Sequence, residues 1–317
     1  MRRTPIAITI ACFLVCSCAS QPAEERSSAV ADQPAASPAH DGTLVVMLGT
    51  GTPNPDPERS GPATAVIAGG QAYLVDCGPG VVRRAEAAWQ RGIDELDMPG
   101  LTRLFVTHLH SDHTAGYADL ILTPWVLGRE RPLVVYGPPG IRSMTDHLLA
   151  AYAEDIDIRL HGNQPQNEPG IAVEAHEIAP GEVYQDENVK VTAFAVPHGG
   201  WEHAFGFRFD TADRSVVITG DTTPSDNVVE ACSGCDVLVH EVCAKIGLDG
   251  RPSDWQAYHK ASHTSGVELG EIAARARPKL LVLYHQLMWG ATEEELLTEI
   301  RRSFNGEVAF ADDLDVY

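Results

Sequence analysis

Short apolar runs alternate with amphipathic stretches along most of this chain of 317 residues. Runs of β-branched and aliphatic residues bounded by Gly, Pro, Asn or Asp are typical of buried strands. They predict strands at residues 44–48, 63–68, 71–75, 104–106, 133–136, 189–196, 204–209, 215–219 and 280–285, and in the run that ends at 239–242. Longer stretches predict helices at residues 80–91, 117–127, 141–152, 223–232, 265–275 and 293–304, and residues 163–170 read as a loop.

The order of these elements favours an α/β fold. Both halves of the chain mix strands with helices, so we expect an αββα sandwich, in which two mixed β-sheets are flanked by helices. Ser265 and Glu268 have the spacing of a capping box, which predicts that Ser265 caps the helix at 265–275. Residues 43–317, about 275 in number, are expected to form one domain, because that length can bury a large core.

The first residues resemble an export signal. Arg2 and Arg3 precede an apolar stretch that ends at Cys18 and is too short to span a bilayer. Residues 1–18 are therefore predicted to be a signal peptide, and residues 19–42, rich in Ala, Pro, Ser and Glu, a flexible linker. The segment before Cys18 resembles a bacterial lipobox, which predicts that Cys18 carries lipid and anchors the protein to a membrane. The protein is therefore expected to be exported, either to the periplasm or as an outer-membrane lipoprotein. Ordinary cleavage near Ala19, or a misassigned start codon, is the alternative.

The chain carries a formal net charge of −21 at pH 7. No run of Lys or Arg follows the leader, and RNA or DNA binding depends on such residues to release counterions. We therefore expect a small anionic substrate and regard tRNA as an improbable partner. Metal ions could still attract a small anion locally.

Four cysteines follow the leader, and two of them have C-x-x-C spacing, Cys232 and Cys235. In an oxidising compartment we expect them to form a disulfide, with two buried thiols as the alternative. Among the aromatic residues near the motifs below, Trp255, Tyr258 and Trp289 are interpreted mainly as core packing rather than as substrate contacts.

A dense group of metal-ligating side chains follows the strand predicted at residues 104–106. His108, His110, Asp112 and His113 lie within six residues of one another. Imidazoles and carboxylates are the nitrogen and oxygen ligands that zinc prefers. The pattern indicates a metal site, and the alternative is a polar surface turn.

Three later segments offer ligands that would complete such a site. His198, Asp221 and His285 each terminate an apolar run that reads as a buried strand. Ligand-binding residues of α/β sheets usually gather at strand ends. One such His could be structural, but three strand ends together with the first group make ligation the better interpretation.

On these motifs the chain resembles the metallo-β-lactamase-fold hydrolases, in the branch of ribonuclease Z, related phosphodiesterases and arylsulfatases. The resemblance runs from about residue 44 to the C-terminus and includes the segments at 48–53 and 74–78. It implies two zinc ions per chain, although manganese or iron can occupy such ligand sets. A hydroxide held between the ions would attack the ester. The implied ligands are His108, His110 and His198 for one ion, Asp112, His113 and His285 for the other, and Asp221 as the bridge.

The resemblance also implies catalytic residues. Asp112 would both bind an ion and take part in catalysis, and two further residues would act beside it. Glu241 would orient His263, and His263 would face the scissile group as a proton donor. The family usually continues after Glu241 with Ala-Thr, whereas Val242 and Cys243 stand here, so the surroundings of Glu241 are open. For His263 the alternative is an exposed loop position.

These features predict a dinuclear-zinc hydrolase that cleaves a phosphodiester or an aryl sulfate ester. The alternative enzyme is a tRNA 3′-processing endoribonuclease, ribonuclease Z. That enzyme inserts a basic arm between the counterparts of His198 and Asp221, and here the interval leaves room only for a hairpin. The non-enzymatic alternative is a metal-binding surface lipoprotein that keeps the fold without catalysis. The family often dimerises, so a homodimer is also left open.

Overall fold

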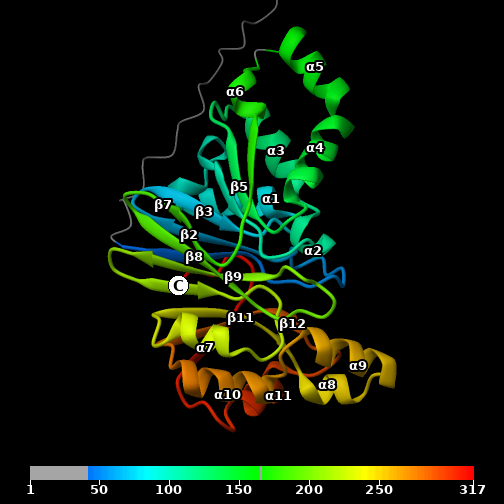
Figure 1. The fold of residues 1–317 in the computed structure, drawn as a ribbon, viewed down its shortest axis with the longest axis vertical. Coiled ribbons are helices and arrows are strands. Elements are labelled where there is room, and N and C mark those ends of the chain that lie inside the picture. Colours follow the sequence, from blue (N-terminus) through cyan, green and yellow to red (C-terminus); the bar gives the residue numbers. More distant parts are fainter. Residues whose placement is uncertain (1–41, 165) are drawn as a thin grey trace, which may run out of the picture. The chain divides into compact units, whose positions relative to one another are not determined.

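Two β-sheets lie face to face in the computed structural model, which describes residues 42–164 and 166–317 (Figure 1). The first sheet has six strands in the order β1-β2-β3-β4-β5-β6. β1, β2 and β3 pair antiparallel, and the strands from β3 to β6 pair parallel. Its strands are β1 Leu44–Gly49, β2 Ala63–Ala68, β3 Gln71–Val75, β4 Arg103–Phe105, β5 Leu133–Gly137 and β6 Val173–Glu177.

The second sheet has seven strands in the order β13-β12-β11-β10-β9-β8-β7. The strands from β10 to β13 pair parallel, and those from β7 to β10 pair antiparallel, so both sheets are mixed. Its strands are β7 Gly181–Gln185, β8 Val189–Ala195, β9 Phe205–Thr211, β10 Ser215–Ile218, β11 Val237–Cys243, β12 Leu280–Leu287 and β13 Glu307–Phe310.

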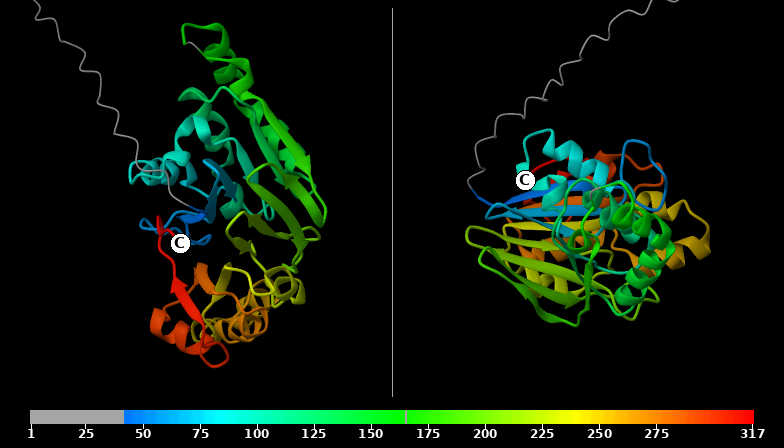
Figure 2. Two further views of the ribbon diagram at one scale, coloured as in Figure 1. Left: turned by 90° about the vertical axis from the view of Figure 1, so that its left-hand side faces the viewer. Right: turned by 90° about the horizontal axis from the view of Figure 1, so that it is seen from above.

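Helices cover the outer faces of the sheets, as the left view of Figure 2 shows, with cyan to green helices at one end and yellow to orange helices at the other. The N-terminal group follows strands of the first sheet: α1 Val81–Trp89, α2 Ser111–Thr114, α3 Tyr117–Val126, α4 Ile141–Ala151, α5 Ala153–His161 and α6 Glu168–Ile171. The C-terminal group follows strands of the second: α7 Asp226–Cys232, α8 Lys245–Asp249, α9 Ser253–Ser262, α10 Gly266–Ala276 and α11 Glu293–Ile300. Two 3₁₀ turns, Asp94–Leu96 and Met98–Gly100, precede β4.

Three apolar layers hold this sandwich together. The layer between the sheets is aromatic, and the ring of Phe105 lies with its centroid 5.6 Å from Phe207 and 5.4 Å from Phe209. One outer layer packs the first sheet against α1 and α3, and the other packs the second sheet against α7, α10 and α11. Burial of apolar surface on both faces of each sheet explains why most strands read as continuous apolar runs. The predicted αββα fold is therefore confirmed.

Most predicted elements are present with small shifts at their ends. Ser265 and Glu268 form both hydrogen bonds of the predicted capping box. The helix predicted at 223–232 begins only at Asp226, because the side chain of Ser225 accepts a hydrogen bond from the Asn227 N–H and caps it. The predicted disulfide between Cys232 and Cys235 is also present.

The sequence did not predict β6, β7, β13, α5, α8 or α9, and the loop predicted at 163–170 contains the start of α6. β6, β7 and β13 are edge strands of the sheets, and many of their side chains are half-buried or exposed, so they lack an apolar run. The interpretation of Trp255 and Tyr258 as core residues is wrong, because they are 48% and 47% exposed on α9.

The predicted signal peptide, nearly all of the predicted linker and Cys18 lie outside the described residues. Among the helices of residues 42–164 and 166–317, none combines the length and the apolar content needed to cross a bilayer.

Candidate metal centre

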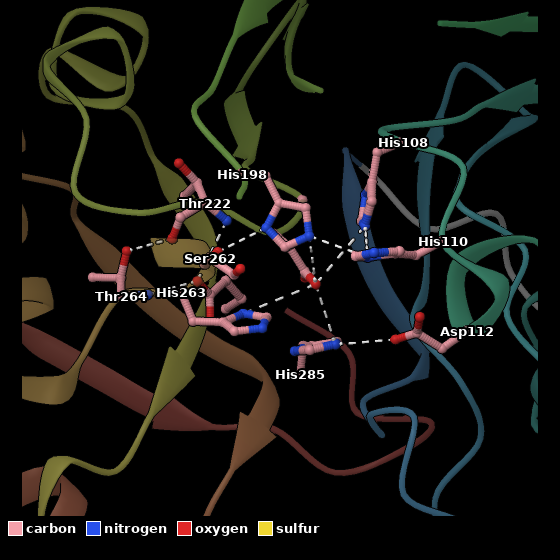
Figure 3. A network of polar contacts seen from close by, with 12 residues as sticks. His108, His110, Asp112, His198, Thr222, Ser262, His263, Thr264 and His285 are labelled. Atoms are coloured by element: carbon pink, nitrogen blue, oxygen red, sulfur yellow. Dashed lines mark hydrogen bonds and ion pairs between the residues drawn. The ribbon is translucent and has the colours of Figure 1, made fainter. Parts of the chain in front are cut away.

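The structure brings all seven predicted ligands together. Figure 3 labels His108, His110, Asp112, His198 and His285 of this set. The segment after β4 carries His108 and His110 and leads into α2 with Asp112 and His113, His198 follows β8, Asp221 follows β10, and His285 lies in β12. The polar surface turn considered for the first group is excluded, since His108 and His113 are fully buried.

A β-bulge directs His285 into the site, and β12 does not end there as the sequence suggested. On the neighbouring strand β11, Glu241 pairs with Tyr284 and Val242 pairs with Gln286, so His285 is the extra residue. Its backbone takes the left-handed conformation, with φ of 45°. A bulge of this kind re-aims a side chain without ending the strand.

Gly220 allows the ends of β4 and β10 to approach each other. Its φ is +62°, and a Cβ at this position would lie 2.7 Å from Cβ of Thr107. Any side chain here would therefore push Asp221 away from His108 and His113.

His108, His110 and His198 form the first cluster. His110 Nδ1 lies 3.0 Å from His108 Nε2 and 3.1 Å from His198 Nε2. Asp221 Oδ2 lies 3.9 Å from Nε2 of both His108 and His198. These four ligand atoms all lie within 4.8 Å of one another, as one shared cation would require.

Asp112, His113 and His285 form the second cluster on the other side of Asp221. Asp112 Oδ2 is 3.2 Å from His285 Nε2 and 3.6 Å from His113 Nε2. Asp221 Oδ1 is 3.4 Å from His113 Nε2, and its Oδ2 is 3.5 Å from His285 Nε2. Asp221 thus contacts both clusters, which is the position of a bridging carboxylate.

Groups behind the histidines decide which ring nitrogen faces the centre. Asp76 Oδ2 lies 2.8 Å from His113 Nδ1, and the carbonyl oxygen of Ser262 lies 2.7 Å from His198 Nδ1. The indole N–H of Trp201 donates to His110 Nε2 at 2.7 Å, so His110 faces the cluster through Nδ1. Such contacts fix the orientation of metal-binding imidazoles.

Sequence reasoning assigned no role to Asp76, and it grouped Trp201 with aromatic residues interpreted mainly as core packing, whereas Trp201 is 36% exposed. Asp76 follows the apolar strand β3 and has a left-handed backbone, φ 60°. A carboxylate directly after a buried strand is the signal that could have found it. Trp201 carries no comparable signal, since only the fold brings the loop after β8 beside His110.

Burial and charge perturb these groups strongly. Burial lowers the pKa of His108 well below its usual value. Burial would also lower the pKa of His113, but Asp221 and Asp76 beside it raise that pKa well above its usual value. Burial would raise the pKa of Asp221, yet His285 and His113 hold it well below the usual range. Asp221 is therefore a permanent negative charge among imidazoles.

The donor set fits divalent cations. His113 Nε2 and Asp221 Oδ1 are both buried and face each other at 3.4 Å, and neither has a hydrogen-bond partner. Buried polar atoms without partners are costly, and a cation between the two clusters would satisfy these two. Imidazole and carboxylate ligands in this number are typical of zinc.

His263 and Glu241 lie beside the clusters as expected from the resemblance. His263 is 5% exposed at the end of α9, so the exposed-loop alternative is excluded. Its Nδ1 is 3.5 Å from Glu241 Oε2 and 4.0 Å from Asp221 Oδ2. The other Glu241 oxygen accepts a hydrogen bond from the Thr264 N–H at 2.8 Å.

Burial affects the protonation of both His263, the predicted proton donor, and Glu241, predicted to orient it. Burial lowers the pKa of His263 to about 4, although Asp221 opposes the shift. Burial and then the charge of Asp221 raise the pKa of Glu241 well above its usual value. With a pKa of about 4, the His263 imidazole is neutral near pH 7.

Comparison with known proteins agrees with this picture. The beta-lactamase superfamily domain matches residues 71–286. The ribonuclease Z of Mycobacterium marinum is 34% identical over 275 residues, 85% of this chain and 96% of that protein. A metallo-beta-lactamase fold protein from Bacillus subtilis, 20% identical, superposes with a TM-score of 0.67 over 87% of this chain and 99% of the other. The short form of human tRNase Z, 24% identical, superposes with a TM-score of 0.62 over 86% of this chain and 98% of the other.

The fold and the site define a metal-dependent hydrolase with the metallo-β-lactamase fold. The chain belongs to the beta-lactamase superfamily, in the branch that contains ribonuclease Z. The predicted family is therefore confirmed, and the ligand chemistry agrees with a divalent metal, typically zinc.

The comparisons conflict with our expectation that tRNA is an improbable partner. The relative from Mycobacterium marinum is a ribonuclease Z, and the similarity spans nearly its whole length. Beside the lack of Lys or Arg runs and the short interval between His198 and Asp221, our argument rested on the net charge of the whole chain. That quantity does not describe the local field at a cluster of cations, which is what a phosphate group meets.

Proposed function

We propose that this chain is a zinc-dependent phosphodiesterase of the ribonuclease Z kind that cuts precursor tRNA at its 3′ end. The observation that carries the proposal is the position of Asp221, which joins two ligand clusters at the end of a buried strand. Identity of 34% with a ribonuclease Z supports the choice of a phosphodiester in RNA. This was our alternative function, and the relatives favour it over the aryl sulfate ester.

Two zinc ions in such a site would lower the pKa of water and neutralise charge on the substrate oxygens. His108, His110 and His198 would hold one ion, Asp112, His113 and His285 the other, and Asp221 both. His263 would donate a hydrogen bond to the leaving oxygen, since its side chain lies between Asp221 and an adjoining pocket. Glu241 would set the orientation of that imidazole.

A panel of substrates with purified zinc-loaded protein tests the proposal. Precursor tRNA with a 3′ trailer and bis-nitrophenyl phosphate should be hydrolysed, and nitrophenyl sulfate should not. Asp221→Ala should lose bound zinc and activity together, whereas Asp226→Ala, an exposed carboxylate on α7, should lose neither. Failure of the two-zinc protein to cleave any phosphodiester would end the proposal.

The role of His263 has its own test. His263→Ala should reduce turnover of RNA by roughly a hundredfold or more, a typical effect of a group that assists a leaving oxygen. Loss on bis-nitrophenyl phosphate should be much smaller, because nitrophenolate leaves without assistance. Equal losses on both substrates would remove this role from His263.

A small phosphodiester is the second candidate substrate. Between His198 and Asp221, β9 and β10 are joined by residues 212–214 alone, so the long arm expected of a tRNA-gripping enzyme is not present there. Cleavage of bis-nitrophenyl phosphate without cleavage of precursor tRNA would select this candidate.

From the sequence alone we further propose that residues 1–18 export the protein and that Cys18 carries lipid. Detergent phase partitioning of the full chain tests this, with Cys18→Ser as the control. An equal distribution of both proteins into the aqueous phase would refute the anchor. The homodimer stays a prediction, to be measured by light scattering.

A further inference from the structure

A pocket of about 600 Å³ opens next to the candidate metal centre, and His263 is part of its wall. Its volume lies in the range of sites that bind small ligands. The other walls come from α9 and from the segment after β12, with Trp255, Tyr258, His259 and Trp289 as the aromatic members. Figure 1 shows α8 and α9 near β12.

The spacing along α9 explains why the aromatic side chains gather there. Trp255, Tyr258 and His259 are three and four residues apart and so share one face of the helix. Trp255 and Tyr258 are nearly half exposed. Large aromatic side chains left in water on an otherwise acidic chain are unusual for a face that only packs, and they are typical of binding surfaces.

A row of rings leads from this surface to the metal centre. The Trp255 ring stacks on His259 at a centroid distance of 5.7 Å and an interplanar angle of 23°. The His259 ring lies 5.4 Å from His263 and 4.5 Å from Trp289. His263 in turn reaches Asp221 at 4.0 Å. A planar group seated on these rings would therefore lie beside the candidate metal centre.

One buried polar atom in the same pocket lacks a hydrogen-bond partner. His259 is 93% buried, since its exposed fraction is 7%, and its Nδ1 has no hydrogen-bond partner. Arg251, Asp254 and Asn54 also line the pocket, and Asn54 comes from the loop after β1. Stacking surfaces with a few donors and acceptors around them suit a heteroaromatic ring better than an aliphatic chain.

We propose that this pocket is a base-binding subsite, which stacks the nucleobase next to the scissile phosphodiester on the rings of α9. The inference rests on the proposed function and specifies its substrate as a nucleotide whose base is held, rather than any phosphodiester. In this subsite Trp255 and Tyr258 would supply the stacking faces, and Trp289 and Arg251 are further lining residues.

Binding of two nucleotide fragments tests the subsite without relying on turnover. Adenosine 5′-monophosphate and ribose 5-phosphate carry the same phosphate and sugar and differ only in the base. Calorimetry with the zinc-loaded full chain should give at least a tenfold tighter affinity for the first, as expected for one stacked base. Trp255→Ala and Tyr258→Ala should each lower that preference, and Trp255→Phe should keep most of it.

Tyr152→Ala is the matched control, because Tyr152 is 41% exposed at the end of α4 and does not line this pocket. It should leave the preference unchanged, and zinc content should be the same in every variant. Equal affinity for the two fragments, or a preference that survives in a Trp255→Ala, Tyr258→Ala double variant, would overturn the subsite. A preference that depends on Trp255 in a protein that does not cut RNA would instead keep the subsite and remove the proposed function.

Discussion

Replacement of Asp76 by Asn should weaken metal binding without touching a proposed ligand. Asp76 is buried, and its Oδ1 accepts a hydrogen bond from the Thr107 N–H at 2.8 Å. Its Oδ2 lies 2.8 Å from His113 Nδ1 and so holds the proton on that nitrogen. His113 Nε2, which faces Asp112 and Asp221, is thereby the nitrogen that gives up its proton and offers a lone pair when a cation binds.

In Asp76→Asn the amide oxygen must still accept from Thr107, so the amide nitrogen faces His113 Nδ1. The amide N–H donates to His113 Nδ1, so Nδ1 has to accept a hydrogen bond. The imidazole proton then moves to Nε2 of His113, where it blocks a cation. Loss of such an outer contact typically costs 10- to 100-fold in metal affinity. In free energy this is roughly 1.4–2.7 kcal/mol, and the loss of a hydrogen bond to a charged group is of similar size, about 1.5–3 kcal/mol.

Zinc affinity measured by competition with a chromophoric chelator, together with elemental analysis, checks this prediction. One ion should be retained by the cluster of His108, His110 and His198, and the other should bind at least tenfold more weakly. Asp186→Asn is the control, because Asp186 also accepts several hydrogen bonds but lies in a network with Tyr73 and Tyr184 away from the centre. If Asp76→Asn binds two ions as tightly as the native chain, the tautomer argument is wrong.

Three further predictions concern stability. Arg129 is fully buried and donates hydrogen bonds to the carbonyl oxygens of residues 101, 120, 121 and 170. Arg129→Met should leave these acceptors unpaired and lower the free energy of unfolding by about 4 kcal/mol. An unchanged urea midpoint would contradict this. Burial lowers the pKa of His240 to about 4, so the unfolded chain binds the proton more tightly and stability should fall as the pH drops from about 6.5 toward 4, by about 3 kcal/mol in all. Urea titrations across that range should show a flatter dependence for His240→Gln, and identical slopes would refute the assignment. Removal of metal with EDTA should lower the Tm, and zinc at about 100 times its Kd should restore about 2.7 kcal/mol per site, whereas a Tm insensitive to both treatments would argue against metal binding.

The ligands could be predicted because chemistry and local structure coincide in the sequence. His198 and Asp221 each follow an apolar strand, and the group from His108 to His113 is dense enough to stand out alone. The ends of neighbouring strands lie at a common edge of a sheet, so local patterns identified the candidate ligands without knowledge of tertiary contacts. The family resemblance then divided these candidates between two ions. The β-bulge at His285 could not be predicted from the sequence, because an inserted residue changes the strand register without changing the composition.

The aromatic pocket could not be predicted for a different reason. α9 has no apolar face against the core, since only His259 and Ser262 of its residues are buried. Pattern reasoning assumes that apolar residues are inside, and it therefore assigned Trp255 to the core. The same assumption fails wherever a face is kept for a ligand.

The arrangement of the ligands makes the core between the sheets part of the site. The first cluster takes His108 and His110 from the first sheet and His198 and Asp221 from the second, and the other cluster is divided in the same way. Each ion would thus be held by both sheets, so the distance between the sheets sets the distances between ligands. That spacing depends on Phe105 against Phe207 and Phe209 below the site, and on the absence of a side chain at Gly220. Because ligand atoms must be placed to within a few tenths of an ångström, close packing of these rings is a condition for binding two ions, and not only for stability.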